Sequence, residues 1–266
     1  MARNNRQDRA RERALLSMQR ALGVVQKQIE ELMLKLPSED GMLDSTAISL
    51  QNTTRIRSQI IATMQRQGAK VVSSAADDAL ADAAAFAVND LDLGEFKADV
   101  SKDLERILSP RVEEITKEVT GRGRVMADLV RQRMASGASV SRLLEDASKQ
   151  FQTAQSQIET VVDTAVSAVY VDANVERHTI DQEELGEPAL FQYLGPASGD
   201  VLRPWCAKLV TSTTKQVYTR EAIDKMKPAE GQPGPVRAYC GGYNCRHEWS
   251  PIDAETVAER GYKIVR

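Results

Sequence analysis

Hydrophobic residues recur at steps of three and four over most of the first 180 residues, the spacing that places side chains on one face of an α-helix. The first such segment predicts a helix over about 7–35. Its apolar stripe consists of Leu15, Met18, Leu22, Val25, Ile29, Leu32 and Leu36. Pro37 predicts its end, and 38–41 reads as a loop. Two interpretations remain open: the helix docks on partner subunits, or it packs on the body of its own protein.

The same spacing predicts further helices up to residue 180. They are expected over about 44–67, 70–89, 95–107, 109–135, 140–150 and 152–178. The segment 70–89 is rich in alanine, which forms helices well and permits close approach between them. These helices make the first two thirds of the chain a helical region.

Capping residues and glycines set the expected boundaries. Ser109-Pro110 is typical of a helix start, with a capping serine and a proline at the first position. The run Gly121-Arg-Gly-Arg124 predicts a kink or break in the helix that follows. Gly137 predicts the end of that helix, and Ser139 or Ser141 is expected to cap the next one.

The pattern changes after residue 188. Seven of nine prolines and eight of twelve aromatic residues lie beyond residue 180, which predicts a loop-rich module with a different kind of core. Leu190–Leu194 alternates like a strand, and Val217-Tyr218 predicts a short second strand. Thr219 is expected to cap a helix over 220–227, and Cys245–Trp249 to begin a third strand, closed by a turn at Pro251. The fold class predicted is mainly α: long N-terminal helices followed by a small α+β C-terminal module.

Charge narrows the range of partners only locally. The net charge is −3, which favours no general affinity for nucleic acid. Residues 1–20, however, carry six arginines against two acids, so the N-terminal tip is basic. The residues predicted to contact nucleic acid or a partner there are Arg3, Arg6, Arg9, Arg11 and Arg13. No run of about 18 apolar residues predicts a membrane span, and the N-terminus lacks the apolar core of a signal peptide, so synthesis in a cytoplasm is expected.

All three cysteines lie in the terminal module. Cys206, Cys240, Cys245 and His247 are zinc's preferred ligand types, and four of them would make a structural site, although the spacing lacks a C-x2-C knuckle. In a second interpretation the cysteines are small buried hydrophobes and His247 is a hydrogen-bonded core residue. A third pairs Cys206 or Cys245 with His247 or His178 as a nucleophile. Two histidines in 266 residues and no tight acidic cluster argue against an enzyme.

Other residues of the module are expected to fix its loops. Arg203 and Arg246 are predicted to pair with the carboxylates of Asp200, Glu248 or Asp253, unless they are solvated surface charges. Pro204, Trp205 and Asn244 belong to the same short motifs. Gly241-Gly242 suits a turn that requires positive φ.

These blocks together resemble a known signature. Phe191–Pro196, Asp200–Cys206, Val217–Ile223 (which contains Tyr218) and Cys240–Trp249 follow one another in the order found at the C-terminus of phage head-morphogenesis proteins, the family of the Mu F-type minor head protein. The helical lead-in 158–168 is also similar, so that the resemblance covers about 140–255. His247 stands where many members have a further cysteine. The predicted organisation is an N-terminal helix or docking arm (1–37), a helical region (38–138) and a Mu F-like domain (139–266).

The resemblance implies a structural minor head (capsid) protein of a tailed phage. Such proteins lie inside the head near the portal vertex in several copies, and bind portal or major capsid protein during assembly. Some touch the packaged double-stranded DNA. Two alternatives are kept: an internal DNA-interacting virion protein, and a cysteine- or metal-dependent hydrolase. The first interpretation requires no cofactor, and zinc is the metal considered for the cysteines and histidine.

Overall fold

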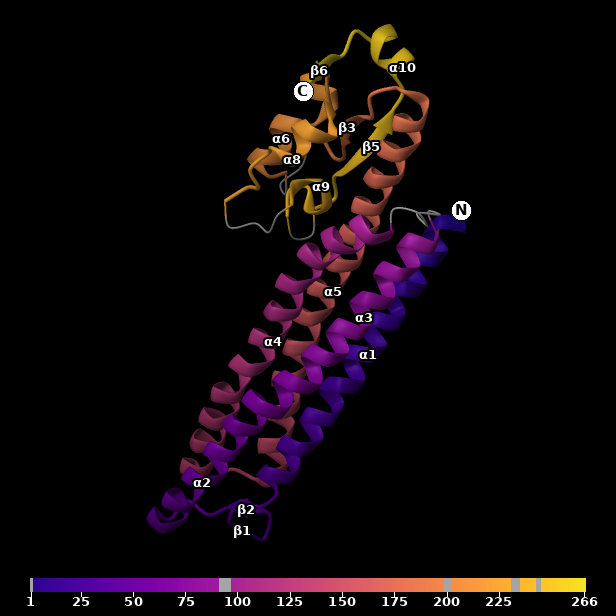
Figure 1. The fold of residues 1–266 in the computed structure, drawn as a ribbon. Helices are drawn as coiled ribbons and strands as arrows, with labels where there is room; N and C mark the ends of the chain where they lie inside the picture. Colours follow the sequence, from indigo (N-terminus) through magenta and orange to yellow (C-terminus); the bar gives the residue numbers. More distant parts are fainter. Residues whose placement is uncertain (1, 91–96, 199–201, 231–234, 243–244) are drawn as a thin grey trace. The chain divides into compact units, whose positions relative to one another are not determined.

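The computed structural model describes residues 2–90, 97–198, 202–230, 235–242 and 245–266 (Figure 1). Within these ranges, the side chains of 2–7, 47–52, 86, 88–90, 97–108 and 212 are not described. The chain divides into two compact units. We call 11–81 with 109–162 the helical unit, and 1–10, 82–108 and 163–266 the C-terminal unit.

Long helices dominate the first 185 residues, which confirms the predicted fold class. Their bounds are α1 (Ala2–Met33), α2 (Ala47–Thr63), the π-helical segment η1 (Met64–Gly68), α3 (Ala69–Asp90), α4 (Lys97–Ala135) and α5 (Val140–Leu185). None of the helices in the described part of the chain is long and apolar enough to cross a membrane.

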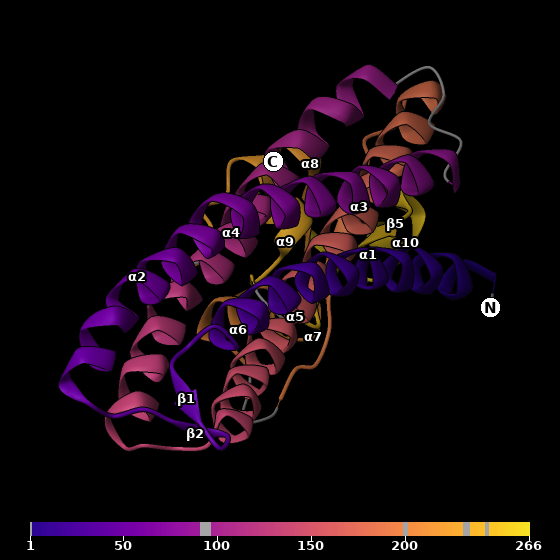
Figure 2. The same ribbon diagram turned by 90° about the horizontal axis from the view of Figure 1, so that it is seen from below.

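The apolar stripe of α1 is buried inside the helical unit. Its buried members include Ala14, Met18, Ala21, Leu22, Val25, Ile29 and Met33, while Leu15 and Leu32 are only half-buried. The Nε2 of Gln19 donates to Glu159 of α5 at 3.3 Å. Within this unit the helices run side by side (Figures 1 and 2). The stripe of α1 therefore packs on its own protein.

Two helix breaks predicted from the sequence are wrong. Helix α4 runs through Gly121–Arg124 and through Ser109-Pro110 without interruption. A Cβ on Gly123 would lie 2.9 Å from the Cβ of Met64, so this glycine allows close approach of α4 and η1 rather than a kink. Pro110 lies inside α4, where it removes one backbone hydrogen bond. The buried Ile115 and Val119 follow on the same helix, and their burial favours its continuation.

Two pairs of predicted helices are each continuous. Segments 44–67 and 70–89 join through η1, where a π turn replaces the expected gap and buried Gly68 packs near Val25 and Val119. Segments 140–150 and 152–178 form the single helix α5, since no glycine or proline interrupts it and Phe151 is buried. The predicted end at Gly137 (φ +59°) is confirmed, and the Oγ of Ser139 caps α5 by accepting from the backbone N–H of Arg142 at 3.2 Å.

The predicted loop after α1 contains a small hairpin. Strands β1 (Ser38–Glu39) and β2 (Met42–Leu43) pair antiparallel across Asp40-Gly41. Both turn residues have positive φ, the conformation that a two-residue hairpin turn requires.

A four-stranded mixed sheet organises the end of the chain. Its order is β5-β3-β4-β6, with the last pair parallel. The strands are β3 (Leu190–Leu194), β4 (Gln216–Thr219), β5 (Glu248–Ile252) and β6 (Lys263–Val265), and the short helices are α6 (Pro204–Leu209), α7 (Thr211–Thr214), α8 (Arg220–Asp224), α9 (Val236–Tyr239) and α10 (Ala254–Glu259). The strands at 190–194 and 217–218 and the cap at Thr219 are confirmed, since Thr219 accepts from the N–H of Ala222. The predicted turn at Pro251 is wrong: this residue lies in β5, an edge strand, where a missing N–H is tolerated.

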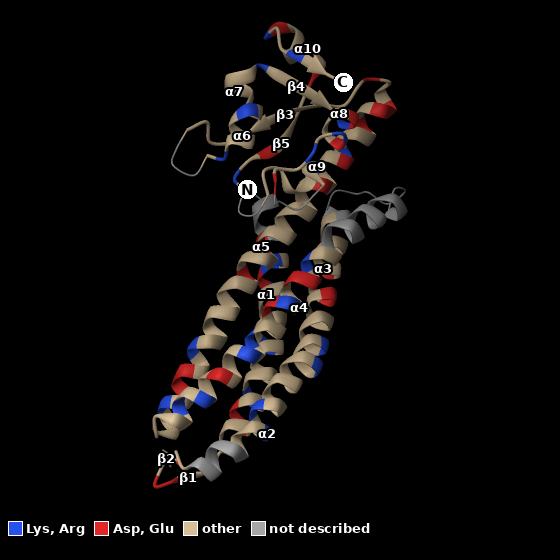
Figure 3. Cartoon of the chain, turned by 90° about the vertical axis from the view of Figure 1, so that its left-hand side faces the viewer, with Lys and Arg blue, Asp and Glu red and all other residues tan. Residues whose placement is uncertain are grey.

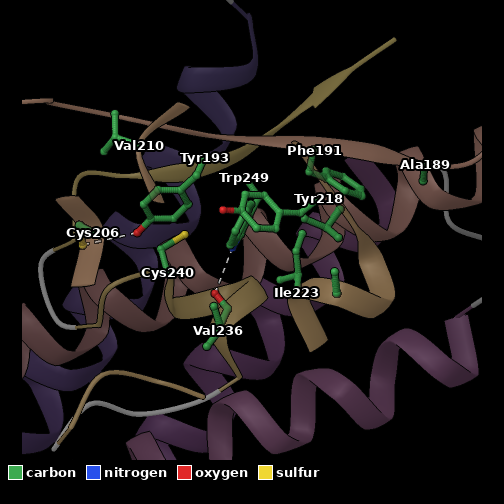
Figure 4. Packing of buried hydrophobic residues seen from close by; sticks show 12 residues of the cluster. Ala189, Phe191, Tyr193, Cys206, Val210, Tyr218, Ile223, Val236, Cys240 and Trp249 are labelled. Atoms are coloured by element: carbon green, nitrogen blue, oxygen red, sulfur yellow. Dashed lines mark hydrogen bonds between the residues drawn. The ribbon is translucent and has the colours of Figure 1, made fainter. Parts of the chain in front are cut away.

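The two faces of this sheet carry two cores. Phe191 and Tyr193 point to one side, where they pack with Tyr218, Trp249 and α5 residue Val175 (Figure 4). The alternate residue Leu190 packs on the other side, with Val217, Ile252 and Val257 of α10. The period-two pattern of β3 thus fills both faces.

Candidate functional site

Cys206, Cys245 and His247 lie together at one end of the aromatic core. Their ligand atoms are all within 4.8 Å of one another. The Sγ atoms of Cys206 and Cys245 are 3.8 Å apart, and the Sγ of Cys245 is 3.5 Å from the Nδ1 of His247. We call these three residues the sulfur–imidazole cluster. The predicted fourth member, Cys240, is buried in the adjoining core and lies outside this group.

Tyr193 closes the cluster from the sheet side. Its hydroxyl donates to the Sγ of Cys206 at 3.5 Å (Figure 4). The same hydroxyl is 3.7 Å from the Sγ of Cys245. Its ring stacks on His247 with an interplanar angle of 3°. The role of Tyr193 was not predicted from the sequence. Its alternation with Gln192 and Leu194 in the predicted strand was the feature that could have indicated a buried side chain.

Local sequence explains how the sulfurs are placed. Arg203 is the N-cap of α6, and Pro204 lies in its first turn. Cys206 therefore lies in that first turn as well, where its side chain is buried. A Cβ on Gly241 would overlap the Sγ of Cys206 and lie 3.0 Å from that of Cys245. The expectation of positive φ holds for Gly242 (φ +98°), whereas at Gly241 the reason for glycine is space.

The loop contact of Arg203 that the structure describes is with a backbone carbonyl rather than with one of the predicted carboxylates. Arg203 donates to the carbonyl of Gly241 at 2.6 Å, which ties α6 to the loop that holds the sulfurs. Asp200 and Asn244 lie outside the described residues. Arg246 is exposed, and Asp253 accepts from the N–H of Thr256 at 2.6 Å as the cap of α10.

Two aromatic residues of the motifs are part of the core. Trp205 is half-buried, and its ring meets that of Tyr193 edge-on. Tyr218 meets Trp249 edge-on at 5.5 Å and donates its hydroxyl to Gln216 at 2.9 Å. The signature residues therefore contribute packing surface to the cluster's surroundings.

Burial sets the protonation of these groups. It raises the pKa of the Cys206 thiol and raises that of Cys240 well above its ordinary value, because a thiolate is poorly solvated there. Burial and the neighbouring sulfurs also raise the pKa of the Tyr193 hydroxyl. In the metal-free protein, Cys206 and Cys240 are therefore neutral thiols near pH 7, which is unlike an activated nucleophile.

His178 takes no part in the cluster. It lies on α5, where its ring meets Phe191 edge-on at 5.2 Å. Burial lowers its pKa. The predicted alternative that pairs a cysteine with His178 has no geometric support, whereas Cys245 does lie beside His247.

A cavity of about 110 Å³ opens beside the cluster. Cys245 and His247 line it from one side and Asp163, Thr164 and Ser167 of α5 from the other. One side of the cluster is thus accessible to a small molecule such as water.

Two ion pairs missed by the sequence analysis join α5 to the sheet region. Arg237 donates to Asp172 at 2.5 Å, and both side chains are at least 94% buried. Arg220 pairs with Glu176 one turn along α5 at 2.6 Å. The sequence did contain an indication of the first pair: Asp172 is a charged residue on the apolar helix face that includes Val169 and Val175.

The arginines predicted for nucleic-acid contact are distributed along α1. Arg9, Arg11 and Arg13 are exposed, while the side chains of Arg3 and Arg6 lie outside the described part. Acids and bases alternate along the helical unit (Figure 3). Its ion pairs include Arg57–Asp128, Arg122–Glu118, Arg131–Asp128 and Arg133–Asp146. Arginines of the helical unit such as Arg57, Arg122 and Arg133 therefore have acidic partners within the chain.

Comparisons with protein-family models, with curated proteins and with solved structures find no match to this chain. The Mu F-like resemblance accordingly rests on the blocks quoted from the sequence.

Proposed function

We propose that this protein is a structural minor head protein of a tailed phage, which binds portal or major capsid protein during head assembly. One observation carries the proposal. The blocks that resemble the head-morphogenesis signature are distant in sequence, yet Tyr193, Cys206, Tyr218 and Trp249 belong to a single packed core. A signature that encodes one fold unit is expected to converge in this way.

The chemistry of the cluster agrees with a structural role. Cys206 is 1% exposed, and burial raises its pKa, so its sulfur is neither accessible nor activated. The hydroxyl of Tyr193 and the ring of His247 fill the space beside it. Such packing stabilises the fold of the terminal region.

If the first helix docks on a partner, as predicted from the sequence, the surface it uses is its solvent-exposed side. The inner stripe is occupied by the helical unit itself, whereas Leu16 and Val24 of α1 are 44% and 50% exposed. Removing residues 1–36 would take core side chains with it, so substitutions of Leu16 and Val24 make a cleaner test. In the proposal these side chains belong to the surface that meets the portal or capsid protein in the head interior.

The test is incorporation into heads. Heads purified from infected cells are expected to contain the chain at a fixed ratio to portal protein, with cross-links between the two. The double variant Leu16→Asp, Val24→Asp should enter heads far less often and keep the unfolding transition of the native protein. Absence of the native chain from purified heads would overturn the proposal.

A hydrolase is the second candidate, favoured by the 3.5 Å contact between Cys245 and His247. Substituting Cys245 by Ser separates the two. A hydrolase would lose turnover with its unfolding midpoint retained, whereas the structural role predicts a lower midpoint.

An internal DNA-interacting role is tested by filter binding. The exposed Arg9, Arg11 and Arg13 motivate it, and such phosphate contacts would give affinity that falls steeply with salt. No retention of double-stranded DNA at about 50 mM salt would dismiss this role.

A further inference from the structure

Two of the three distances in the sulfur–imidazole cluster match the corners of a zinc tetrahedron, and all three ligand atoms lie within 4.8 Å of one another. Zinc holds sulfur at about 2.3 Å and nitrogen at about 2.0–2.1 Å, so two sulfurs lie about 3.8 Å apart and a sulfur and a nitrogen about 3.6 Å apart. The Sγ atoms of Cys206 and Cys245 are 3.8 Å apart, and Cys245 Sγ is 3.5 Å from His247 Nδ1. We propose that Cys206, Cys245 and His247 bind a Zn²⁺ ion.

The surroundings of His247 orient it for this role. Its Nε2 is 3.0 Å from the carbonyl oxygen of Pro196, which can only accept, so Nε2 carries the proton. Nδ1 is then left with its lone pair facing Cys245. Metal-bound histidines commonly donate their other ring N–H to a backbone carbonyl in this manner. Gly195 also leaves room for the ring, because a Cβ there would overlap the imidazole.

The sulfurs have donors as well. The backbone N–H of Gly241 donates to Cys245 Sγ at 3.2 Å, and the hydroxyl of Tyr193 donates to Cys206 Sγ. Both bonds favour the thiolate form that a metal requires. Two thiolates also balance the charge of Zn²⁺, so the buried position of Cys206 does not oppose binding of the neutral assembly.

The fourth position faces the cavity. Cys245 and His247 line it, so water from this side completes the tetrahedron. Cys240 also borders this cavity, but its sulfur does not group with the three ligand atoms, so the proposal does not make it a ligand. It therefore provides a matched control: a buried cysteine of the same unit whose loss should leave the metal in place.

The experiment is metal analysis of the full chain purified without chelators. The native protein should hold about one zinc per chain. Cys206→Ser, Cys245→Ser and His247→Gln should each lose most of the zinc, and Cys240→Ala should retain it. Replacing zinc by Co²⁺ in the native chain should give the visible absorption of a tetrahedral thiolate site, a readout that does not depend on whether the variants fold.

Three results would overturn the proposal. Less than about 0.3 zinc per native chain, together with no cobalt spectrum, excludes the site. Equal zinc in the three ligand variants makes the metal adventitious. A native mass that is two hydrogens below the calculated one, and that returns to the calculated value on reduction, would show a Cys206–Cys245 disulfide instead of a metal site. None of these outcomes depends on whether the protein enters phage heads, so the two proposals fail separately.

Discussion

The helical unit and the C-terminal unit are stabilised in different ways. The core of the helical unit consists mainly of aliphatic, alanine and methionine side chains, such as Val25, Ile29 and Val119, and also contains Phe151 and the buried Arg111, which pairs with Glu114. The sheet region of the C-terminal unit relies on stacked rings, sulfurs and the buried Asp172–Arg237 pair. The first core repeats one kind of contact many times, whereas the second depends on a few contacts that differ from one another.

This difference decides how each unit responds to substitution. In the helical unit the loss of one contact leaves many equivalent ones. In the C-terminal unit each polar partner is specific, and a charged group left behind in the core loses its closest partner while remaining shielded from water. The predictions below are ordered by expected effect and test this contrast.

The largest effect is expected at the buried ion pair. Asp172→Ala removes the buried partner of Arg237 and keeps the more exposed Asp224 carboxylate at 3.2 Å, and should lower the free energy of unfolding by about 3–5 kcal/mol. The matched control is Asp181→Ala, which removes an exposed partner of Arg177 on the same helix and should cost less than about 1 kcal/mol. Urea unfolding measures both. Equal costs would show that the buried pair contributes no more to stability than the exposed one.

A smaller effect is expected where α4 meets η1. Gly123→Ala places a methyl group 2.9 Å from the Cβ of Met64 and should destabilise the helical unit by about 1–3 kcal/mol. Gly121→Ala, two residues earlier in open space, should stabilise the helix by up to about 1 kcal/mol. The sign difference is measured by thermal unfolding. Two stabilising substitutions would show that the close approach is not required.

The sequence predicted the elements of the helical unit better than their continuity. Periodic apolar residues located each helix, because burial of one face leaves a regular trace. The breaks failed because Gly123 and Pro110 were judged locally, whereas packing across the bundle decides what they do. Local propensity alone cannot contain that information.

In the C-terminal unit the sequence located the chemistry but not its pairing. The cysteines and His247 were identified by residue type, and three of the four predicted groups do meet. The role of Tyr193 and the partner of Arg237 were missed, since both depend on how β3 and α5 are placed against residues far along the chain. Contacts of this kind have no fixed spacing in sequence.

The smallest effect is a pH dependence at His178. Burial lowers its folded-state pKa, so the folded protein binds fewer protons than the unfolded chain below about pH 6.5. The free energy of unfolding should therefore fall as the pH drops from 7 through that range. His178→Gln keeps a side-chain donor and removes the titration, and should flatten this part of the profile. The free energy of unfolding is measured by chemical unfolding between pH 7 and pH 5. If its pH dependence is the same in His178→Gln as in the native protein, His178 is not the source of that dependence.

The account's central claim is that the sulfur–imidazole cluster holds the C-terminal unit together. Gly241→Ala tests it most directly, because the variant keeps both cysteines and His247 and only displaces the sulfurs. Differential scanning calorimetry should show an earlier transition for the C-terminal unit than in the native protein. An unchanged transition would contradict the claim.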